Sequence, residues 1–362
     1  MGKKMKRLHQ FIIGATPGDA ITDHALLIQR WLREDGIDSK IYAESIHPSL
    51  VGKVKPYREY RPSHPGELVI LHHSIGSDLV EYLLQLDLRF LVIYHNITPS
   101  TFFQPADPAL VAQMQRGREQ LKRLRERTVL ALGDSSFNEA ELREVGFVHT
   151  GVLPIPLDPS QYELELNSDL VNRYRDTGPR LLFVGRLVPN KKQEDLIKLL
   201  YFYRRIEPSA RLFLVGAPWV PAYAEWLKEL AEELGLGGAV VFTGQVSQQD
   251  LVTYYHLANV YVSMSEHEGF GKPLIEAMYL GVPVVAYAAA AVPETLGGAG
   301  VLFHYKDYEI LAELIDIVIK EKGIRQRIIQ KQRERVSLFL ESRVRQAWNK
   351  FLGGLNEINS LR

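Results

Sequence analysis

The stretch SMSEHEGFGKPLIEAMYLGVP, residues 263–283, decides which fold we predict for this chain. It overlaps an apolar run, Val260–Met264, and places Gly269 and Gly271 in a loop before a helical pattern. Pro273 suits the first position of a helix, and Gly281 suits the position just past its end. The stretch therefore predicts a strand, a glycine loop and a helix, the unit from which parallel α/β sheets are built.

The same alternation of strand-length apolar runs and longer helical patterns extends through both halves of the chain. It predicts an α/β fold with two doubly wound, mostly parallel sheets. The chain has 362 residues, enough for two domains. Three prolines in Val152–Pro159 and the polar stretch Gln161–Thr177 mark the break between them. We expect domains at residues 1–158 and 179–340, a linker at 159–178 and a terminal helix at 341–362.

The composition excludes several classes of function. The 43 basic and 43 acidic residues balance, so we expect no binding of nucleic acid, which needs a basic surface. The sequence holds no cysteine, which rules out disulfides, thiolate metal sites and cysteine nucleophiles. No window approaches 18 apolar residues, and Phe11–Ile13 is too short for a signal peptide. A cytoplasmic protein is expected, and peripheral membrane contact stays open.

Two carboxylates flank the predicted start of the helix. Glu268 lies on the loop and Glu276 in the first helical turn, so both should face one ligand. The N–H groups at a helix start attract an anion such as a diphosphate. Carboxylates repel phosphate, so Glu268 and Glu276 should instead accept hydrogen bonds from sugar or ribose hydroxyls. Placement for the helix dipole would explain Glu276 but not Glu268 with two glycines and a proline.

A second stretch, LFVGRLVPNKKQEDL at residues 182–196, predicts a strand, a basic loop and a helix. Arg186, Lys191 and Lys192 lie on the loop, where cations suit a nucleotide diphosphate and the charge that it gains as a leaving group. Taken alone, this loop could equally be a solvated basic surface. The two stretches together are more informative than either one.

In their order and spacing, the two stretches resemble glycosyltransferase family 4. The matching features are Glu268 and Glu276 around Gly-Phe-Gly, and Val-Gly-Arg-Leu-Val-Pro-Asn-Lys about 80 residues upstream. The resemblance covers the C-terminal half well and the N-terminal half less sharply. It implies a GT-B fold, in which two Rossmann-like domains face each other across a cleft and a C-terminal helix crosses back to the N-terminal domain.

The resemblance also implies roles for individual residues of the C-terminal half. Arg186 and Lys191 would bind the donor diphosphate, although Lys192 is a second cation beside the expected one. Glu268 would contact the donor sugar and take part in catalysis, and Glu276 would hold the ribose hydroxyls. The remaining donor-binding positions would be the backbone N–H groups of Phe270 and Gly271, with Gly216, Gln245 and Val246 bordering the base.

The N-terminal half offers weaker signals. His95, in the strand-to-loop stretch LVIYHNITP at residues 91–99, resembles the catalytic histidine that such enzymes place near the reacting sugar. It could also be a structural histidine at a strand end. Gly18 and Asp19 resemble the acceptor-binding loop of the family but lack its usual glycine pair. Asp19 could equally cap the following helix.

The implied reaction is retaining transfer of a hexose (glucose, mannose or N-acetylhexosamine) from a UDP- or GDP-sugar to a hydroxyl acceptor. The acceptor would be a sugar or a lipid-linked molecule, and the pathway cell-surface polysaccharide or glycoconjugate synthesis. The sequence contains no Asp-X-Asp triplet, so we expect no metal ligands and no cofactor. The positive groups of the protein would hold the diphosphate instead.

Several alternatives can be compared with this interpretation. A dinucleotide-dependent oxidoreductase needs Gly-x-Gly-x-x-Gly after a strand, and a serine hydrolase needs Gly-x-Ser-x-Gly; neither motif occurs, nor does a P-loop. A sugar-nucleotide epimerase or phosphorylase with the same fold, and a non-catalytic nucleotide-sugar-binding protein, stay open. The basic helix predicted at 108–127 is either a solvated face or a docking surface for anionic lipid.

Overall fold

The computed structural model describes residues 5–104, 107–175 and 178–360, with side chains to residue 355. The chain forms two compact units. The first unit comprises Met1–Thr101, Ala109–Pro156 and Glu341–Arg362, and the second comprises Phe102–Pro108 and Leu157–Leu340. Each unit is built on its own parallel sheet, as the alternating pattern predicts.

Within its described residues, the first unit has a seven-stranded sheet in the order β3-β2-β1-β4-β5-β6-β7. The strands are β1 (His9–Ala15), β2 (Ile41–Ile46), β3 (Val54–Pro56), β4 (Glu67–His73), β5 (Leu88–Tyr94), β6 (Thr128–Gly133) and β7 (Thr150–Val152). Their pairings are parallel, and the order reverses between β1 and β4. This is the doubly wound arrangement, in which ligands bind beyond the carboxyl ends of the strands where the order reverses.

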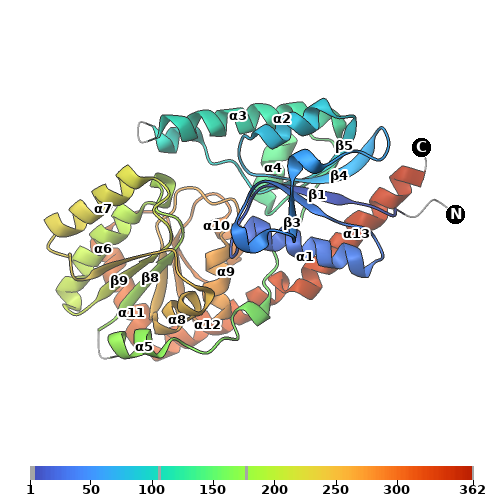
Figure 1. Cartoon of the computed structure of the whole chain (residues 1–362). Helices are drawn as coiled ribbons and strands as arrows, with labels where there is room; N and C mark the ends of the chain where they lie inside the picture. Colours follow the sequence, from blue (N-terminus) through green and yellow to red (C-terminus); the bar gives the residue numbers. More distant parts are fainter. Residues whose placement is uncertain (1–4, 105–106, 176–177, 361–362) are drawn as a thin grey trace. The chain divides into compact units, whose positions relative to one another are not determined.

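Helices cover both faces of this sheet. They are α1 (Ala20–Glu34), α2 (Asp78–Gln85), α3 (Pro108–Leu124), α4 (Ser136–Val145) and α13 (Glu341–Ser360), with short 3-10 turns at Pro48–Leu50, Tyr57–Glu59, Ser100–Phe103 and Arg125–Arg127. Figure 1 shows α1 and α13 on one side of the sheet and α2, α3 and α4 on the other. The apolar stripes of these helices explain why nearly every residue of β4 and β5 is buried.

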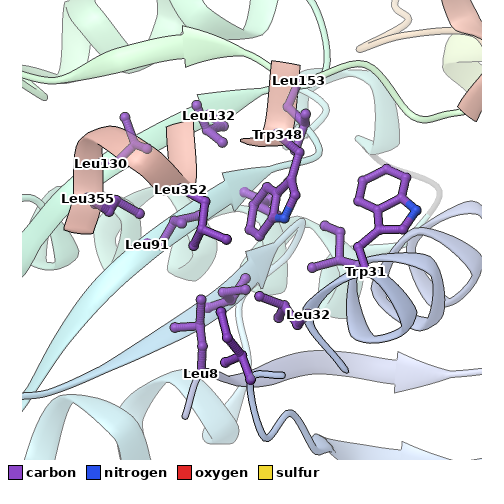
Figure 2. Close-up of a cluster of buried hydrophobic side chains, with 14 of the residues drawn as sticks. Leu8, Trp31, Leu32, Leu91, Leu130, Leu132, Leu153, Trp348, Leu352 and Leu355 are labelled. Carbon is purple, nitrogen blue, oxygen red and sulfur yellow. The ribbon is translucent and has the colours of Figure 1, made fainter. Parts of the chain in front are cut away.

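Helix α13 completes the core of the first unit, although it is the last helix in the chain. Trp348 is fully buried and packs among leucines of three strands, with Leu352 and Leu355 beside it (Figure 2). Glu341 at the start of α13 accepts hydrogen bonds from Trp31 and Arg30 of α1. The expectation that the terminal helix returns to the N-terminal part of the chain is confirmed.

The sheet of the second unit has six strands in its described part, in the order β10-β9-β8-β11-β12-β13, again parallel. These strands are β8 (Arg180–Val184), β9 (Arg211–Val215), β10 (Val240–Gly244), β11 (Val260–Ser263), β12 (Val284–Tyr287) and β13 (Val301–Phe303). Counted from its own first strand, this order matches that of the first sheet, with the reversal between β8 and β11. The two predicted stretches supply these two strands.

The helices of the second unit are α5 (Ser168–Tyr174), α6 (Gln193–Ile206), α7 (Pro221–Glu233), α8 (Gln248–Leu257), α9 (Lys272–Tyr279), α10 (Val292–Leu296), α11 (Tyr308–Lys320) and α12 (Lys322–Val336). Short 3-10 turns lie at Pro159–Gln161, Pro189–Lys191 and Ser337–Phe339. Helices α12 and α13 are separated by the turn Ser337–Phe339 and by Leu340, whose extended backbone interrupts the helical hydrogen bonds.

Residues 159–178, which the sequence predicts as a linker, lie within the second unit except for 176–177, which are outside the described residues. The hydroxyl of Tyr162 donates to Glu276, and the backbone N–H of Asn167 donates to Thr253 Oγ1 at 2.9 Å. The amide of Gln248 donates to the carbonyl of Gln161. These polar residues bond to the second unit, which composition alone could not indicate.

Two details of local structure differ from the prediction. In the sequence, Ser136 and Glu139 have the spacing of a capping box, but the cap of α4 is Ser135, whose hydroxyl accepts from the N–H of Asn138. Glu276 is the fifth residue of α9, not a first-turn residue, because the helix begins at Lys272. Gly281 follows the end of α9 with a φ of 72°, as predicted for a glycine terminating a helix.

Candidate functional site

The candidate site of the second unit lies where its strand order reverses. The loop after β8 carries Arg186 and Lys191, and the loop after β11 carries Glu268 and leads into α9. Since β8 and β11 are neighbours, both loops leave the same edge of the sheet side by side. The fold thus brings together the two stretches that the sequence separates by about 80 residues.

Hydrogen bonds tie these two loops to each other. The backbone N–H of Glu266 donates to the carbonyl of Asn190 at 2.9 Å, and the side chain of Asn190 donates to the carbonyl of His267 at 3.1 Å. Lys191 Nζ lies 2.5 Å from Glu268 Oε2, and the two side chains are 21% and 13% exposed. The expected phosphate-binding cation and the expected sugar-binding carboxylate are therefore direct partners.

Arg186 packs against an aromatic ring. Its guanidinium lies 4.0 Å from the ring centroid of Trp219, in the loop after β9. The two loops run together because Leu187 N–H donates to Ala217 carbonyl at 2.9 Å. Gly216 allows this approach, since a Cβ there would lie 2.1 Å from the carbonyl oxygen of Gly185. The structure therefore gives Gly216 a packing role beside its predicted place near the base.

Glu276 is buried, and both of its carboxylate oxygens accept hydrogen bonds from tyrosines. The hydroxyl of Tyr162 lies 2.7 Å from Oε1, and the hydroxyl of Tyr255 lies 2.8 Å from Oε2. Burial, followed by the charge of Glu276, raises the pKa of Tyr255 well above its usual value, so this phenol stays a donor. Each carboxylate oxygen keeps further acceptor capacity, which suits two adjacent hydroxyls of one ligand.

The glycine loop before α9 is fixed from one side by α10. Ala291 N–H donates to the carbonyl of Glu268 at 3.1 Å, and the hydroxyl of Thr295 donates to the carbonyl of Phe270 at 2.5 Å. Phe270 is buried against Phe339. Gly271 caps the helix with a φ of 86°, a conformation that favours glycine.

Tyr261 of β11 bonds to β8 and is affected by the charges of both carboxylates of the site. Its hydroxyl donates to the carbonyl of Val184, the last residue of β8, at 3.3 Å. Burial raises the pKa of Tyr261 well above its usual value, and the charges of Glu268 and then Glu276 add to the rise. Both carboxylates therefore act on one phenol, and their predicted convergence on one ligand stays a prediction.

Gln245 and Val246 lie just past β10 at the same edge of the sheet. Gln245 is exposed and Val246 is half-buried. Just before them, the carbonyl of Gly244 accepts a hydrogen bond from the N–H of Gly216 at 3.1 Å. This places both residues beyond the carboxyl end of an outer strand, two strands away from β8. Their predicted contact with the base stays a prediction.

Sequence reasoning missed a group of residues that support the site. Lys306 Nζ lies 2.7 Å from Asp195 and 2.7 Å from Glu266, and Lys192 lies 3.7 Å from Glu266. Lys192 thus pairs with Glu266, whereas Lys191 pairs with Glu268. Trp219, Tyr162 and Tyr255 were also missed, since a lone aromatic residue in a sequence gives no sign of its partner.

In the first unit, His95 belongs to a buried cluster at the carboxyl edge of the sheet. Its Nδ1 lies 2.8 Å from Asp134 Oδ2, and its Nε2 lies 2.9 Å from Nδ1 of His72. The side chains of His95 and Asp134 are each 2% exposed. Both ring nitrogens of His95 therefore have partners, and its predicted place beside the reacting sugar stays a prediction.

Asp19 caps α1, as one of its two predicted roles. Its Oδ2 accepts from the N–H groups of Ile21 and Thr22, each at 3.1 Å. Gly18 before it has a φ of 76°. The cap uses one oxygen of Asp19, so the contact of Gly18 and Asp19 with an acceptor also stays a prediction.

The basic residues of α3 and the turn after it have protein partners. Ion pairs join Arg116 to Asp78, Arg118 to Glu141, Lys122 to Glu119 and Arg123 to Glu81, while Arg125 and Arg127 donate to backbone carbonyls. These contacts are compatible with a solvated helix face and with a docking surface for anionic lipid, and both stay predictions. Among the described residues, none of the helices has the length and apolar character that a membrane span requires.

Residues 170–335, which contain both loops of the site, match the model of the family described as Glycosyl transferases group 1. This segment is a group 1 glycosyltransferase domain. The match confirms the resemblance that the two stretches predict.

The chain also has relatives of known name. Over 154 residues it is 32% identical to the GDP-mannose-dependent alpha-(1-6)-phosphatidylinositol monomannoside mannosyltransferase of Mycobacterium tuberculosis, which covers 40% of this chain and 39% of that protein. Over 164 residues it is 29% identical to the serotype-specific mannosyltransferase WbdA of Escherichia coli, covering 45% of this chain and 20% of that protein. The chain thus matches about two fifths or less of the length of these relatives.

Solved structures show the fold of the chain as a whole. Sucrose-phosphate synthase from Thermosynechococcus elongatus has a TM-score of 0.75 at 20% identity, covering 97% of this chain and 99% of that one. Anabaena Alr3699/HepE in complex with UDP and glucose has a TM-score of 0.74 at 19% identity, covering 96% and 100%. These likenesses confirm the predicted GT-B fold class for the chain.

Proposed function

We propose that this protein is a glycosyltransferase that transfers a hexose from a nucleotide-diphosphate sugar to a hydroxyl group. The observation that carries the proposal is the meeting of Arg186 and Lys191 with Glu268 and Glu276 at the strand-order reversal of a group 1 glycosyltransferase domain. Cations there suit a diphosphate, and partly satisfied carboxylates suit the hydroxyls of a sugar and a ribose.

We propose mannose as the hexose and GDP as the carrier, with a UDP-sugar as the second candidate. The two relatives of the chain described above are named mannosyltransferases, one of them GDP-mannose-dependent. A UDP-sugar is favoured by the fold-level likeness to HepE, which was solved with UDP and glucose. The acceptor would be a sugar or lipid-linked hydroxyl in the synthesis of a cell-surface glycoconjugate.

The proposed reaction retains the configuration at the anomeric carbon and uses no metal. The bond between the anomeric carbon and the phosphate oxygen breaks, and the acceptor oxygen bonds to that carbon on the same face. The acceptor proton passes to an oxygen of the departing diphosphate. Arg186, Lys191 and the N-terminus of α9 would stabilise the charge that this leaving group gains.

The test begins with binding of GDP, UDP and ADP to the intact chain, measured by calorimetry. A glycosyltransferase of this kind should bind one of them tightly, and Glu276→Gln should weaken that binding. Incubation of the matching nucleotide sugar with hydroxyl acceptors should then give a glycoside product. Its one-bond coupling between the anomeric carbon and its proton, read by NMR, should indicate the same anomeric configuration as in the donor. EDTA should not change the rate. Failure of all three nucleotides to bind would contradict the proposal.

Two other functions can be told apart by product. A sugar-nucleotide epimerase would convert the nucleotide sugar without an added acceptor. A non-catalytic binding protein would show the same calorimetric affinity with no product from any acceptor. Transfer to an acceptor excludes both.

A further inference from the structure

Four buried side chains of the first unit form one line of hydrogen bonds. Oε1 of Gln10, on β1, lies 3.0 Å from Nε2 of His72, at the end of β4. Nδ1 of His72 lies 2.9 Å from Nε2 of His95, just past β5, and Nδ1 of His95 lies 2.8 Å from Asp134, just past β6. The residues therefore come from four neighbouring strands where the sheet reverses its order.

Gln10 determines which nitrogen of His72 carries a proton. The amide nitrogen of Gln10 donates to the carbonyl of Ala25 at 2.9 Å, so its oxygen faces His72. An amide oxygen can only accept, and Nε2 of His72 must therefore carry the proton of that hydrogen bond. A neutral imidazole has one such proton, which leaves Nδ1 of His72 as an acceptor.

It follows that Nε2 of His95 donates to His72. The hydrogen bonds from Gln10 to Asp134 need three protons, whereas two neutral imidazoles and a carboxylate have only two. The third proton lies between His95 and Asp134 and neutralises this buried pair. Burial lowers the pKa of His72 well below 6.5, with the nearby His95 and His24 adding to the effect, which keeps His72 a neutral acceptor.

A metal ion is the alternative occupant, since His24, His72 and His95 each offer a nitrogen within 4.8 Å of the others. Two nitrogens on one tetrahedral zinc, each about 2.0–2.1 Å from the metal, lie roughly 3.3 Å apart with their lone pairs converging on it. The planes of the His72 and His95 rings are instead parallel within 5°, with facing nitrogens 2.9 Å apart. This geometry fits a shared proton, not a common metal.

The backbone next to His95 fixes its place as well. Its N–H donates to the carbonyl of His73 at 3.0 Å. Asn96 then turns the chain with a φ of 70°, a left-handed conformation that asparagine tolerates better than most residues. The amide of Asn96 donates to Asn138 and Glu141 at 3.0 and 3.1 Å. The imidazole is thus oriented by its backbone and by both of its ring nitrogens.

We propose that Gln10, His72 and Asp134 are positioning residues for His95, and that they hold a proton on its Nε2. His95 is then a hydrogen-bond donor and not a general base. Where the function proposed above holds, His95 cannot take the proton of the acceptor, since its Nε2 donates to His72 and its Nδ1 faces Asp134. The acceptor proton would have to leave by another route, such as the diphosphate oxygen.

The test is NMR of the intact chain with ¹⁵N-labelled histidine at pH 7, which needs no donor or acceptor. His72→Gln and His95→Gln assign the signals, and His73→Gln is the matched control, because His73 is the neighbouring buried histidine but bonds to the carbonyl of Gly117 instead. We expect His72 to be protonated only at Nε2, and His95 to be protonated at Nε2. An unprotonated Nε2 in His95 would overturn the proposal.

Asp134→Asn provides a second measurement if a histidine variant does not fold. Its amide can donate to Nδ1 of His95, so the signal of Nδ1 should move to that of an unprotonated nitrogen while Nε2 keeps its proton. Zinc at about one equivalent per chain, removed by chelation with a change in the signals of His72 and His95, would also overturn the proposal. Absence of nucleotide binding would contradict the proposed function and leave these spectra unchanged.

Discussion

Lys191 and Glu268 form an ion pair at 2.5 Å in a largely buried part of the candidate donor site. Without a ligand, each residue thus neutralises the charge of the other. A diphosphate that binds Lys191 must compete with this carboxylate, while a sugar hydroxyl can share it. The pair therefore couples recognition of the diphosphate to recognition of the sugar.

Lys191→Met should weaken nucleoside diphosphate binding roughly 10- to 100-fold, in line with about 1.5–3 kcal/mol for a hydrogen bond to a charged group. The variant also leaves the charge of Glu268 facing the phosphates. Calorimetry with GDP and UDP measures the change. Lys228→Met is the matched control, since Lys228 forms an exposed pair with Glu225 on α7. Equal affinity in Lys191→Met and wild type would contradict the assignment.

Glu268→Gln should separate binding from turnover. It removes the competitor of Lys191, so the affinity for the free nucleotide should stay the same or rise. Turnover of the nucleotide sugar should fall at least tenfold, because the carboxylate no longer accepts from the sugar. Steady-state kinetics beside calorimetry gives both numbers, and a parallel loss of nucleotide affinity would contradict the model.

Trp219→Ala should weaken nucleotide binding by a factor of about 2 to 5, matching about 0.5–1 kcal/mol for a cation–π contact at a partly exposed site. The expected cause is a less ordered Arg186, so Trp219→Phe should recover much of the loss. Trp226→Ala is the control, because Trp226 is 44% exposed, close to the 40% of Trp219. Identical effects of the two alanine variants would argue against a specific role of the ring over Arg186.

Tyr255→Phe should lower the free energy of unfolding by about 1–3 kcal/mol, because the buried carboxylate of Glu276 loses a donor. Nucleotide affinity should fall as well, since the carboxylate is no longer held for the ribose. Chemical unfolding and calorimetry test both effects, with Tyr305→Phe as control at a position that is 85% exposed. A stable variant with unchanged affinity would show that Tyr162 suffices.

Stability should decline on acidification through the titration of His73. Burial lowers the pKa of His73 from 6.5 to about 4 in the folded protein. Between these values the unfolded chain binds the extra proton, so the contribution is complete above pH 6.5 and is lost as the pH falls towards 4. The loss should reach about 3 kcal/mol.

Urea unfolding at pH 7, 6 and 5 measures this dependence. The buried residues His72 and His9, whose pKa values are also lowered, steepen the total slope. His73→Gln should therefore flatten the slope without abolishing it. The same slope in the variant and the wild type would assign the effect to other groups.

Trp348→Ala should destabilise the first unit by about 3–5 kcal/mol, because the side chain is fully buried among leucines of the sheet. Thermal unfolding of the intact chain measures the change. Leu338→Ala, at a position that is 49% exposed, is the control. A midpoint within a degree of wild type would contradict the central place of Trp348 in Figure 2.

Much of the fold could be predicted because the local sequence patterns agree with the tertiary structure. Strands such as β4 and β11 are continuous apolar runs, and Gly281 ends α9 as predicted. The short edge strands β3, β7 and β13 were missed, since three residues carry too little periodicity to identify a strand.

The candidate site could be predicted only in part. Arg186, Lys191, Glu268 and Glu276 follow from two motifs, and the fold places them at one edge of a sheet. Their partners come from elsewhere in the chain: Trp219 from the β9 loop, and Tyr162 from a stretch that looked like a linker. Pairings of this kind depend on the register of neighbouring strands and loops, which a single sequence does not reveal.

The return of α13 to the first unit also bears on protein synthesis. During translation, β1 through β7 leave the ribosome long before Trp348, while Leu157–Leu340 emerge as one continuous stretch. The apolar face of the N-terminal sheet that Trp348 later covers therefore stays exposed until the second unit has been synthesised. During that interval the exposed apolar face makes the nascent chain prone to aggregation.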